Sequence, residues 1–415
     1  MDIIERPEET KRINECKKWV LVYGRRKTGK TFLIQNFVDY DEYYFVKRDK
    51  SVFSKNDKNL NYDTFLELFK RDLRDGKTII VDEFHRLGNE FFDMLHYTKR
   101  TGKLILISST LFLSKNILSS HSPLLGLFAE VPLGLISLND SIKYLSRNKD
   151  EFNIHKKDMF EIAVIMREPI TIDYLNNDLS NPREKIMTIL SSSMLTIPSL
   201  VGEIFSEEER NLSSVYEGVL RAIASGKENS GEISSHLFSK KLIKKDDPSM
   251  IQQYLNNLRQ FGIVKRINIY QRKEFAYKLT SPLMRLFYYS DDKYNISERK
   301  PSDAELLNII SELMPRIVED EIREFLANKF GLQESVGRGK DYDIDLILLK
   351  FKNPELVGEV KWKDSIKSGD VEKTYKNLEK IETKEKILFV PDKKIYPKNL
   401  KGIKVVDIMD FVNVQ

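Results

Sequence analysis

The sequence predicts an α/β protein of several domains that begins with a parallel sheet and ends with a smaller α/β domain. Three observations support this class. The apolar run 19–23 leads into a loop bounded by glycines, and a helix-like segment follows the loop. A second apolar run, 78–81, ends in the adjacent acids Asp82 and Glu83. Near the C-terminus, two further strand-like segments carry the carboxylates Asp345 and Glu359.

Length and composition limit the classes of protein that remain. A chain of 415 residues predicts two to four domains, and its 41% hydrophobic and 32% charged residues suit a soluble globular protein. The single cysteine, Cys16, excludes a disulfide framework and a cysteine zinc site. No apolar stretch approaches the length that spans a bilayer, and the first residues lack the order of a signal peptide. We therefore expect a cytoplasmic protein that does not contact membranes.

The loop at 24–31 has the P-loop pattern G-x-x-x-x-G-K-T in the strand–loop–helix context that the motif requires. Glycine permits the backbone angles of such a loop, and its amides then face phosphate groups. Lys30 would reach the β- and γ-phosphates, and the Thr31 hydroxyl would bind Mg²⁺. The motif predicts ATP and Mg²⁺ as cofactors, with the binding residues Gly24, Arg25, Arg26, Lys27, Thr28, Gly29, Lys30, Thr31 and Phe32.

Two later strand ends supply the other groups that nucleotide hydrolysis needs. Asp82 would hold Mg²⁺ through water, and Glu83 would polarise the attacking water, as in a Walker B motif. The apolar run 104–107 ends in hydroxyl residues and fits a sensor strand between the P-loop and Walker B strands. There, Ser109 or Thr110 would contact the γ-phosphate or the water; capping of the following helix is the structural alternative. We expect the nucleotide core at 1–137 and a helical lid at 138–204.

On these residues the chain resembles the archaeal AAA+-type ATPases that are related to the STAND group. The resemblance rests on Glu5-Arg6-Pro7-Glu8-Glu9, on the two motifs above, on Ser108-Ser109 and on segment 122–126. In the family an arginine that can sense the γ-phosphate usually follows that last segment, but Leu127 stands here, and the family's Gly-Gly-x-Pro turn is replaced at 167–170. These departures bear on hydrolysis more than on binding. The candidate substitutes are Arg147, Arg167 and Arg183.

Residues 205–290 predict a winged helix, because three helices at 207–224, 232–242 and 248–260 precede an alternating hairpin at 263–279. Residues 205–300 carry 17 basic and 12 acidic side chains, which favours a polyanionic partner. In a DNA-binding winged helix, a polar helix face enters the major groove and basic residues contact phosphates. The alternative is a winged helix used only for protein packing. The groove residues would be Gln252, Gln253, Asn256, Asn257 and Arg259, and the phosphate contacts Lys265, Arg266, Arg272 and Lys273.

The C-terminal segment, 301–415, has the E…D…E-x-K pattern of the PD-(D/E)xK nuclease fold. Glu359 and Lys361 are two apart on a strand and therefore share a face, and Asp345 joins them if the two strands pair. Asp345 and Glu359 would bind Mg²⁺, Lys361 would position or activate water, and Glu319 would complete the metal site. The resemblance implies the same segment, since many ATPases of the family carry one. The alternative is a degenerate domain that cleaves nothing.

The sequence favours an ATP-binding and ATP-hydrolysing protein that acts on DNA, in which the C-terminal domain cuts or only holds the nucleic acid. The first alternative is an ATP-controlled switch that binds protein partners, favoured by the missing arginine after Gly126. A small-molecule P-loop kinase explains residues 1–200 poorly and the rest of the chain not at all. GTP specificity is disfavoured, because Asn148-Lys149-Asp150 lacks a preceding strand. Self-association stays open, since a neighbouring subunit can supply an arginine.

Overall fold

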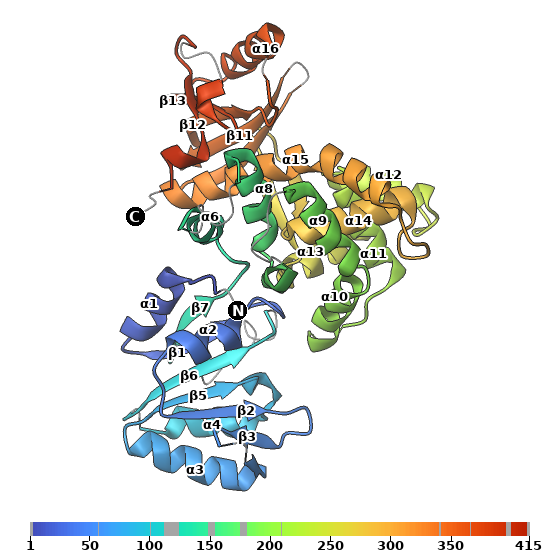
Figure 1. Ribbon diagram of the computed structural model, residues 1–415. Helices are drawn as coiled ribbons and strands as arrows, with labels where there is room; N and C mark the ends of the chain where they lie inside the picture. The colour runs from blue at the N-terminus through green and yellow to red at the C-terminus, as the bar shows by residue number, and fades with distance from the viewer. Residues whose placement is uncertain are drawn as a thin grey trace.

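The computed structural model describes residues 3–56, 58–99, 101–111, 124–147, 154–174, 181–208, 210–339, 342–365, 367–395 and 400–412. Figure 1 shows the N-terminal α/β core at the bottom, the second sheet at the top, and most of the helices between and beside them. Among the described residues, no single helix is long and apolar enough to cross a membrane, although the bent pair Pro182–Ser192 and Thr196–Glu207 reaches that length and composition together.

The N-terminal sheet has seven strands in the order β4-β3-β2-β5-β6-β1-β7. The five strands from β2 to β7 in this order pair in parallel, and β3 and β4 extend the sheet in antiparallel fashion. Strand β6 lies between β5 and β1, which confirms the place expected for the sensor strand. The strands are β1 (Trp19–Tyr23), β2 (Glu42–Val46), β3 (Val52–Ser54), β4 (Asn59–Leu60), β5 (Thr78–Asp82), β6 (Lys103–Ser108) and β7 (Phe128–Pro132).

Helices cover both faces of this sheet, as its parallel strands require. Alternate side chains of β1 point to opposite faces: Val20 and Val22 join one apolar cluster, and Leu21 joins the other. Helices α1 (Pro7–Glu15) and α2 (Lys30–Phe37) cover the first face, and α3 (Tyr62–Arg74) and α4 (Asn89–Tyr97) cover the second.

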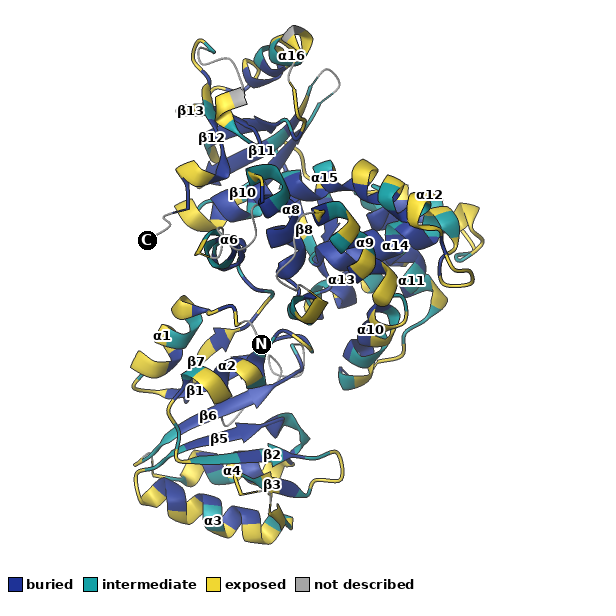
Figure 2. Ribbon diagram, viewed as in Figure 1, coloured by how far each residue is buried: buried dark blue, intermediate teal, exposed yellow. Residues whose placement is uncertain are grey.

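The segment expected to form a lid is helical. It contains α6 (Leu138–Arg147), α8 (Lys156–Met166), the 3₁₀ helix η2 (Pro169–Tyr174), α9 (Pro182–Ser192) and α10 (Thr196–Glu207). All eight residues from Met159 to Met166 are buried, and Figure 2 shows α8 as mostly dark blue. Its apolar side chains share one cluster with residues as distant as Val412. The lid therefore packs as part of the C-terminal half.

Residues 214–279 contain the three helices and the antiparallel hairpin expected of a winged helix. These are α11 (Ser214–Ala224), α12 (Ser230–Ser239), η3 (Pro248–Ile251) with α13 (Gln252–Gln260), and the strands β8 (Val264–Ile269) and β9 (Phe275–Leu279). The single helix expected at 207–224 is wrong at its start: α10 ends at Glu207 and α11 begins at Ser214. The apolar face predicted for the third helix is confirmed, since Ile251, Leu255 and Leu258 are fully buried.

The hairpin is also part of the second seven-stranded sheet, whose order is β14-β13-β12-β11-β10-β8-β9. Strand β8 pairs in parallel with β10 through Asn268 and Ile269. The segments expected as a winged helix and a C-terminal domain therefore share one sheet. The other strands of this sheet are β10 (Gln333–Arg338), β11 (Asp343–Lys350), β12 (Asn353–Val360), β13 (Glu385–Phe389) and β14 (Lys404–Val406). The helices of this part of the chain are α14 (Pro282–Tyr294), α15 (Asp303–Phe330), α16 (Ser368–Leu378), η4 (Lys393–Ile395) and η5 (Ile408–Asp410).

Candidate nucleotide site and a second carboxylate site

Two glycines give the loop between β1 and α2 its shape. Gly29 has φ 83°, in the left-handed region that glycine adopts without strain, and it directly precedes α2. A Cβ atom at Gly24 would lie 2.1 Å from the carbonyl oxygen of Leu133. The loop backbone is therefore held against the end of β7, and larger residues are excluded at both positions.

The Lys30 ammonium is buried beneath this loop. Its Nζ donates to the carbonyl oxygens of Gly24, at 3.0 Å, and Arg25, at 2.8 Å. Burial lowers the pKa of Lys30 to about 8, and the nearby carboxylates of Glu83 and Asp82 oppose this shift. The side chain therefore lies against the backbone of the loop.

Asp82 at the end of β5 faces the start of α2. Its Oδ2 accepts hydrogen bonds of 2.7 Å from the hydroxyls of Thr31 and Tyr43, and its Oδ1 accepts one of 2.8 Å from the Glu83 amide. Burial raises the pKa of Asp82, and the bonds from Thr31 and Tyr43 partly offset that effect. A carboxylate beside a hydroxyl is the hard oxygen donor set that suits Mg²⁺, so the residues expected to hold the ion fit it.

Glu83 stands in a strained backbone conformation, with φ 56°. Such positions cluster at functional sites, where the surrounding structure fixes a side chain direction. The Glu83 Oε2 atom lies 2.8 Å from Ser109 Oγ and 3.3 Å from His85 Nδ1. Of the two hydroxyls proposed from the sequence, Ser109 therefore faces the acid, whereas Thr110 Oγ1 faces Ser108 Oγ at 2.8 Å.

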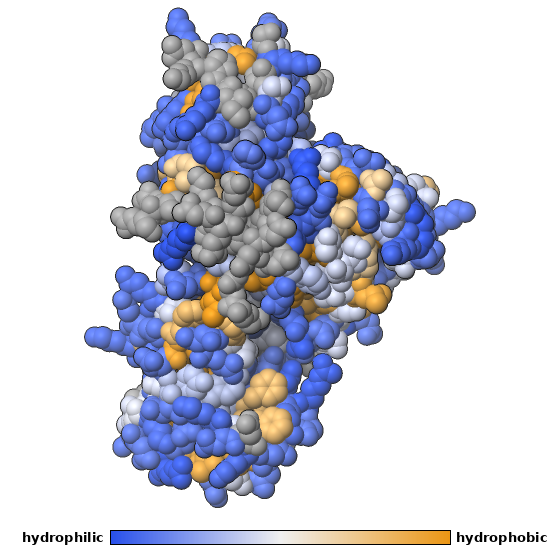
Figure 3. All heavy atoms as spheres, in the orientation of Figure 1, coloured by the Kyte–Doolittle hydropathy of each residue, from blue (hydrophilic) through white to orange (hydrophobic). Residues whose placement is uncertain are grey.

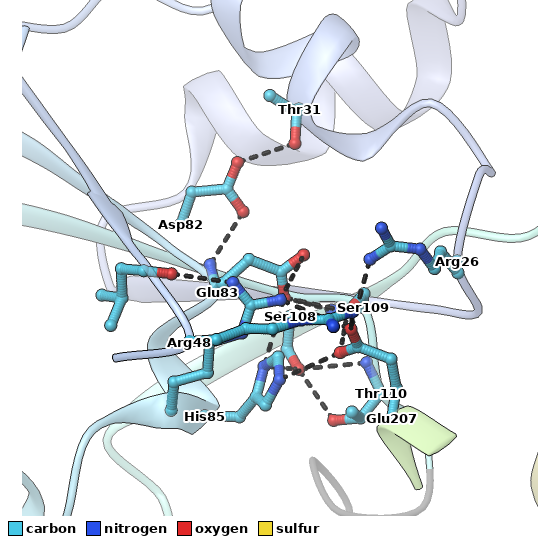
Figure 4. Close-up of polar contacts among 12 residues, drawn as sticks. Arg26, Thr31, Arg48, Asp82, Glu83, His85, Ser108, Ser109, Thr110 and Glu207 are labelled. Carbon is cyan, nitrogen blue, oxygen red and sulfur yellow. Dashed lines mark hydrogen bonds and ion pairs between the residues drawn. The ribbon is translucent and has the colours of Figure 1, made fainter. Parts of the chain in front are cut away.

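A carboxylate that the sequence did not indicate enters this site from the last residue of α10. Glu207 Oε2 lies 3.0 Å from Ser109 Oγ and 3.3 Å from His85 Nε2 (Figure 4). Its Oε1 atom lies 3.3 Å from Arg26 Nη1 and 3.4 Å from Arg86 Nη2. The hydrogen bond from His85, followed by that from Ser109, brings the pKa of Glu207 to about 2 against the opposing effect of burial.

The two arginines of the loop connect it to the lid. Arg25 Nη2 lies 2.6 Å from Glu168 Oε2 in a buried ion pair, and Arg26 Nε lies 2.5 Å from Glu203 Oε2. The other loop residues differ in exposure: Thr28 is buried, whereas Lys27 and Phe32 are exposed. The predicted binding set therefore divides into groups that face the site and groups that hold the lid or face solvent.

The residues expected to form a nuclease site come from three places: Asp345 lies on β11, Glu359 and Lys361 lie at the end of β12, and Glu319 lies on α15, close enough for its charge to act on Asp345. Strands β11 and β12 pair with Leu346 opposite Gly358, so Asp345 and Glu359 are close. Asp345 Oδ2 accepts a 3.0 Å bond from the Val360 amide, and Lys361 Nζ donates to Glu359 Oε2 at 2.7 Å. Asn377 of α16, which the sequence did not indicate, donates to Glu359 Oε1 at 2.9 Å.

Burial, together with neighbouring carboxylates, raises the pKa of two acids of this group. Burial, and then the charge of Asp320, raises the pKa of Glu319 to about 7. Burial, and then the charges of Glu319 and Glu359, raise the pKa of Asp345. Among the described residues, however, the group that brings three ligand atoms within 4.8 Å of one another is Glu83, His85 and Glu207. Asp345 and Glu359 fit Mg²⁺ by donor chemistry.

Two of the DNA contacts expected in the winged helix are wrong. Lys265 is held between Glu324 and Glu334, with Nζ 3.2 Å from Glu334 Oε1. Asn257 is buried and donates to the Tyr216 hydroxyl at 2.5 Å. The other positions face outward: Gln252, Gln253, Asn256, Arg266, Arg272 and Lys273 are exposed, and Arg259 is half-buried.

Four lysines that the sequence analysis did not assign precede η3 and α13 in the chain. They occupy the segment between α12 and η3 and are all exposed: Lys240, Lys241, Lys244 and Lys245. The repeated lysine pairs were the signal that could have identified them, because a cluster of like charges next to a predicted groove-reading helix favours phosphate contacts.

Residues 16–133 match the family model of the AAA domain. Over its full length the chain is similar to the uncharacterized protein MJECL04 of Methanocaldococcus jannaschii, with 24% identity over 461 residues that cover 98% of this chain and 99% of that protein. Two solved structures are also similar. The Aeropyrum pernix ORC2 protein in ADPNP–ADP complexes has 14% identity and a TM-score of 0.38, over 74% of this chain and 89% of that chain. The Aeropyrum pernix ORC1 protein in complex with DNA has 15% identity and a TM-score of 0.31, over 72% and 95%.

The match makes the N-terminal part of the chain AAA+ ATPase-like, and the P-loop residues described above lie inside it. The three arginines considered as γ-phosphate sensors all have other partners. Arg167 pairs with Glu321 and Glu324 of α15, and Arg183 Nη2 lies 3.1 Å from Glu161 Oε1. Arg147 is largely exposed, 3.9 Å from Glu5. Residues 122–123 and 148–150 lie outside the described part of the chain.

A cavity of about 700 Å³ lies between the AAA domain and the C-terminal half. Gly24 and Arg25 line it from the P-loop, and residues 132–135 line it from the end of β7. Helix α15 contributes Glu321, Glu324, Phe325, Asn328 and Lys329. Arg25 Nη1, which is buried, has no hydrogen-bond partner in the described structure. In Figure 3, apolar atoms gather about halfway up the molecule, above the N-terminal α/β core, while most of the remaining visible surface is hydrophilic.

Proposed function

We propose that the AAA domain binds and hydrolyses ATP with Mg²⁺. The observation that carries this proposal is the 2.7 Å hydrogen bond between Thr31 and Asp82, because it unites the P-loop and Walker B groups at one point. Lys30 binds the β- and γ-phosphates, Thr31 and Asp82 hold the ion, and Glu83 orients the attacking water. Bound Mg²⁺ supplies charge neutralisation for the phosphates as the bond to the γ-phosphate breaks.

Equilibrium binding and steady-state hydrolysis test this proposal together. Lys30→Ala removes a charge that faces the phosphates and should weaken ATP binding. Glu83→Gln should keep ATP affinity within about twofold and slow hydrolysis at least about 100-fold, since positioned general bases contribute effects of that order. Hydrolysis by Glu83→Gln at the wild-type rate would overturn the assigned role.

We also propose that the chain binds duplex DNA through the face of α13 and the four lysines that precede it. The exposed amides Gln252, Gln253 and Asn256 suit base edges, and the lysines suit phosphates. Replacing Lys240, Lys241, Lys244 and Lys245 with alanine should weaken DNA binding and flatten its salt dependence, because fewer counterions are released.

The matched control replaces four exposed lysines of the N-terminal α/β core: Lys11, Lys17, Lys18 and Lys70. It removes the same net charge from another face and should leave both the affinity and the salt slope nearly unchanged. Equal losses in the two quadruple variants would mean that binding follows net charge and not the α13 face. Complete lack of DNA binding by the wild-type chain would favour the protein-binding switch.

A second candidate activity, Mg²⁺-dependent cleavage of DNA, is supported by the proximity of Glu319, Asp345, Glu359 and Lys361. The assay is cleavage of plasmid and single-stranded DNA with and without ATP. The double variant Glu359→Ala, Lys361→Ala should lose all cleavage. If the wild-type chain binds DNA and cuts neither substrate, the C-terminal site holds nucleic acid without cleaving it.

A further inference from the structure

Glu207 is a carboxylate in the candidate nucleotide site that ATP hydrolysis by the P-loop and Walker B residues does not use. Its carboxylate is only 8% exposed and comes from α10, outside the AAA domain match. Figure 4 shows it beside Ser109 and His85, with Arg26 directed toward it from the P-loop. Arg86 and Arg48 add two more cations, at 3.4 and 3.9 Å from its Oε1 atom.

The charges around this carboxylate favour an anion at its position. Three guanidinium groups lie within 4 Å of Glu207. His85 uses different ring nitrogens toward its two acidic neighbours, Nδ1 toward Glu83 and Nε2 toward Glu207. A bound cation would have to displace these partners, whereas a second anion could use the same donors. The cluster is therefore built to accept negative charge.

The donors that hold Glu207 are also those expected around a terminal phosphate. Arg26 lies in the P-loop, and Ser109 follows the sensor strand and faces Glu83. Charge-assisted hydrogen bonds to a carboxylate and to a phosphate use the same groups. Both anions in one site would repel each other at short range. The γ-phosphate of ATP and the Glu207 carboxylate therefore compete for these donors.

The end of α10 is coupled to the winged helix by aromatic packing. Phe205 lies two residues before Glu207. Its ring centroid is 4.7 Å from that of Tyr216 in α11 and 5.1 Å from that of Phe261 at the end of α13. Tyr216 in turn packs on Tyr254 of α13 at 4.7 Å. The next residue, Glu208, accepts a hydrogen bond from the Leu111 amide of the AAA domain. A shift of Glu207 would therefore move contacts of α11 and α13.

We propose that Glu207 is an internal anion of the nucleotide site, which ATP displaces by its γ-phosphate and which ADP leaves in place. This inference rests on the proposed ATP binding and adds its regulation: the AAA domain reports the terminal phosphate to the winged helix through α10. A ligand shifts an equilibrium only through differential affinity, and the competition at Glu207 supplies it.

The test compares Glu207→Gln with Glu203→Gln. Both remove one negative charge that faces Arg26, but Glu203 is 43% exposed and lies outside the Ser109 and His85 cluster. ATP and ADP affinities are measured with fluorescent nucleotide analogues. Glu207→Gln should tighten ATP binding about five- to tenfold, within the usual range of coupling between sites, and change ADP binding less than about twofold. Glu203→Gln should change neither by that much.

A second readout follows the winged helix directly. Hydrogen exchange at residues 210–224 should increase when ATP is added to the wild-type chain, and Glu207→Gln should show the increased exchange without nucleotide. Glu207→Asp, which retains the charge on a shorter side chain, replaces Glu207→Gln if that variant does not fold, and should give a smaller change in the same direction.

The outcomes separate this inference from the proposed function. If the wild-type chain binds neither ATP nor ADP, the proposed nucleotide function fails. If it binds both, and Glu207→Gln tightens them equally or not at all, ATP binding stands and the role of Glu207 is overturned. Unchanged exchange at residues 210–224 in Glu207→Gln overturns the coupling to the winged helix.

Discussion

Arg25 of the P-loop and Glu168 of the lid form a buried ion pair, with Nη2 2.6 Å from Oε2. The Ser281 hydroxyl also donates to Glu168 at 2.6 Å, at the start of α14. One carboxylate thus joins the nucleotide loop, the lid and the C-terminal half. Because Glu168 is 1% exposed, its charge depends on these two partners for compensation.

Removing one partner of this pair should be costly. Arg25→Met leaves Glu168 buried without its cation, and we expect a loss of about 3–5 kcal/mol in the free energy of unfolding. Urea denaturation measures the change. The control is Glu203→Gln, which breaks the more exposed pair with Arg26 and should cost less than about 1 kcal/mol. Equal losses in the two variants would contradict the assigned burial of the pair.

The hydroxyl of Thr31 should set the Mg²⁺ requirement. Thr31→Val keeps the shape of the side chain and removes the donor to Asp82, so more Mg²⁺ should be needed for half-maximal ATP hydrolysis. Thr31→Ser keeps the hydroxyl and should remain close to wild type. The measurement is hydrolysis rate against Mg²⁺ concentration, and the same Mg²⁺ dependence in Thr31→Val and Thr31→Ser would be inconsistent with the hydroxyl as a ligand.

The raised pKa of Glu319, about 7 against an ordinary 4.5, predicts a pH dependence of stability. The folded state holds this proton more tightly than the unfolded state, so stability falls as pH rises from about 4.5 to 7. The full effect is at most about 3 kcal/mol. Glu319→Gln, which stays neutral, should flatten the profile in this window. Denaturant midpoints from pH 4.5 to 8 measure it, and parallel profiles for variant and wild type would refute it.

Two adjacent asparagines of α13 should behave differently. Asn257→Ala removes the buried hydrogen bond to Tyr216 and should cost about 1–2 kcal/mol of stability, with DNA affinity preserved in the folded protein. Asn256→Ala, at an exposed position, should weaken DNA binding without changing stability. Thermal melting and DNA titration of both variants check the pair, and the reverse assignment would mean that Asn257 reads DNA.

The nucleotide motifs could be predicted from sequence because each is local. The P-loop, Asp82, Glu83 and Ser109 follow directly on apolar strands, and the parallel order of those strands brings their ends together. Glu207 could not be predicted, because it reaches Ser109 from 98 residues away in the chain and the charged residues that follow it continue a helix-like pattern into 214–224.

The surface of the winged helix was misjudged for a related reason. Lys265 reads as an exposed cation in an alternating hairpin. The pairing of β8 with β10 brings its side chain within 3.2 Å of Glu334, and α15 supplies Glu324. Hairpin alternation gives the face of a side chain but does not reveal which later strand or helix packs against that face. The proximity of Asp345 and Glu359 could be predicted from the sequence, because the two residues lie on neighbouring strands of one hairpin.

The strands from β9 to β14 form one continuous hydrogen-bonded sheet, and this fixes the distance between α13 and the carboxylates Asp345 and Glu359. Helix α13 packs on β8, and the carboxylates of β11 and β12 belong to the same sheet. Under the two proposed DNA activities, a duplex held by α13 would present one fixed stretch of backbone, counted in base pairs from α13, to Asp345 and Glu359.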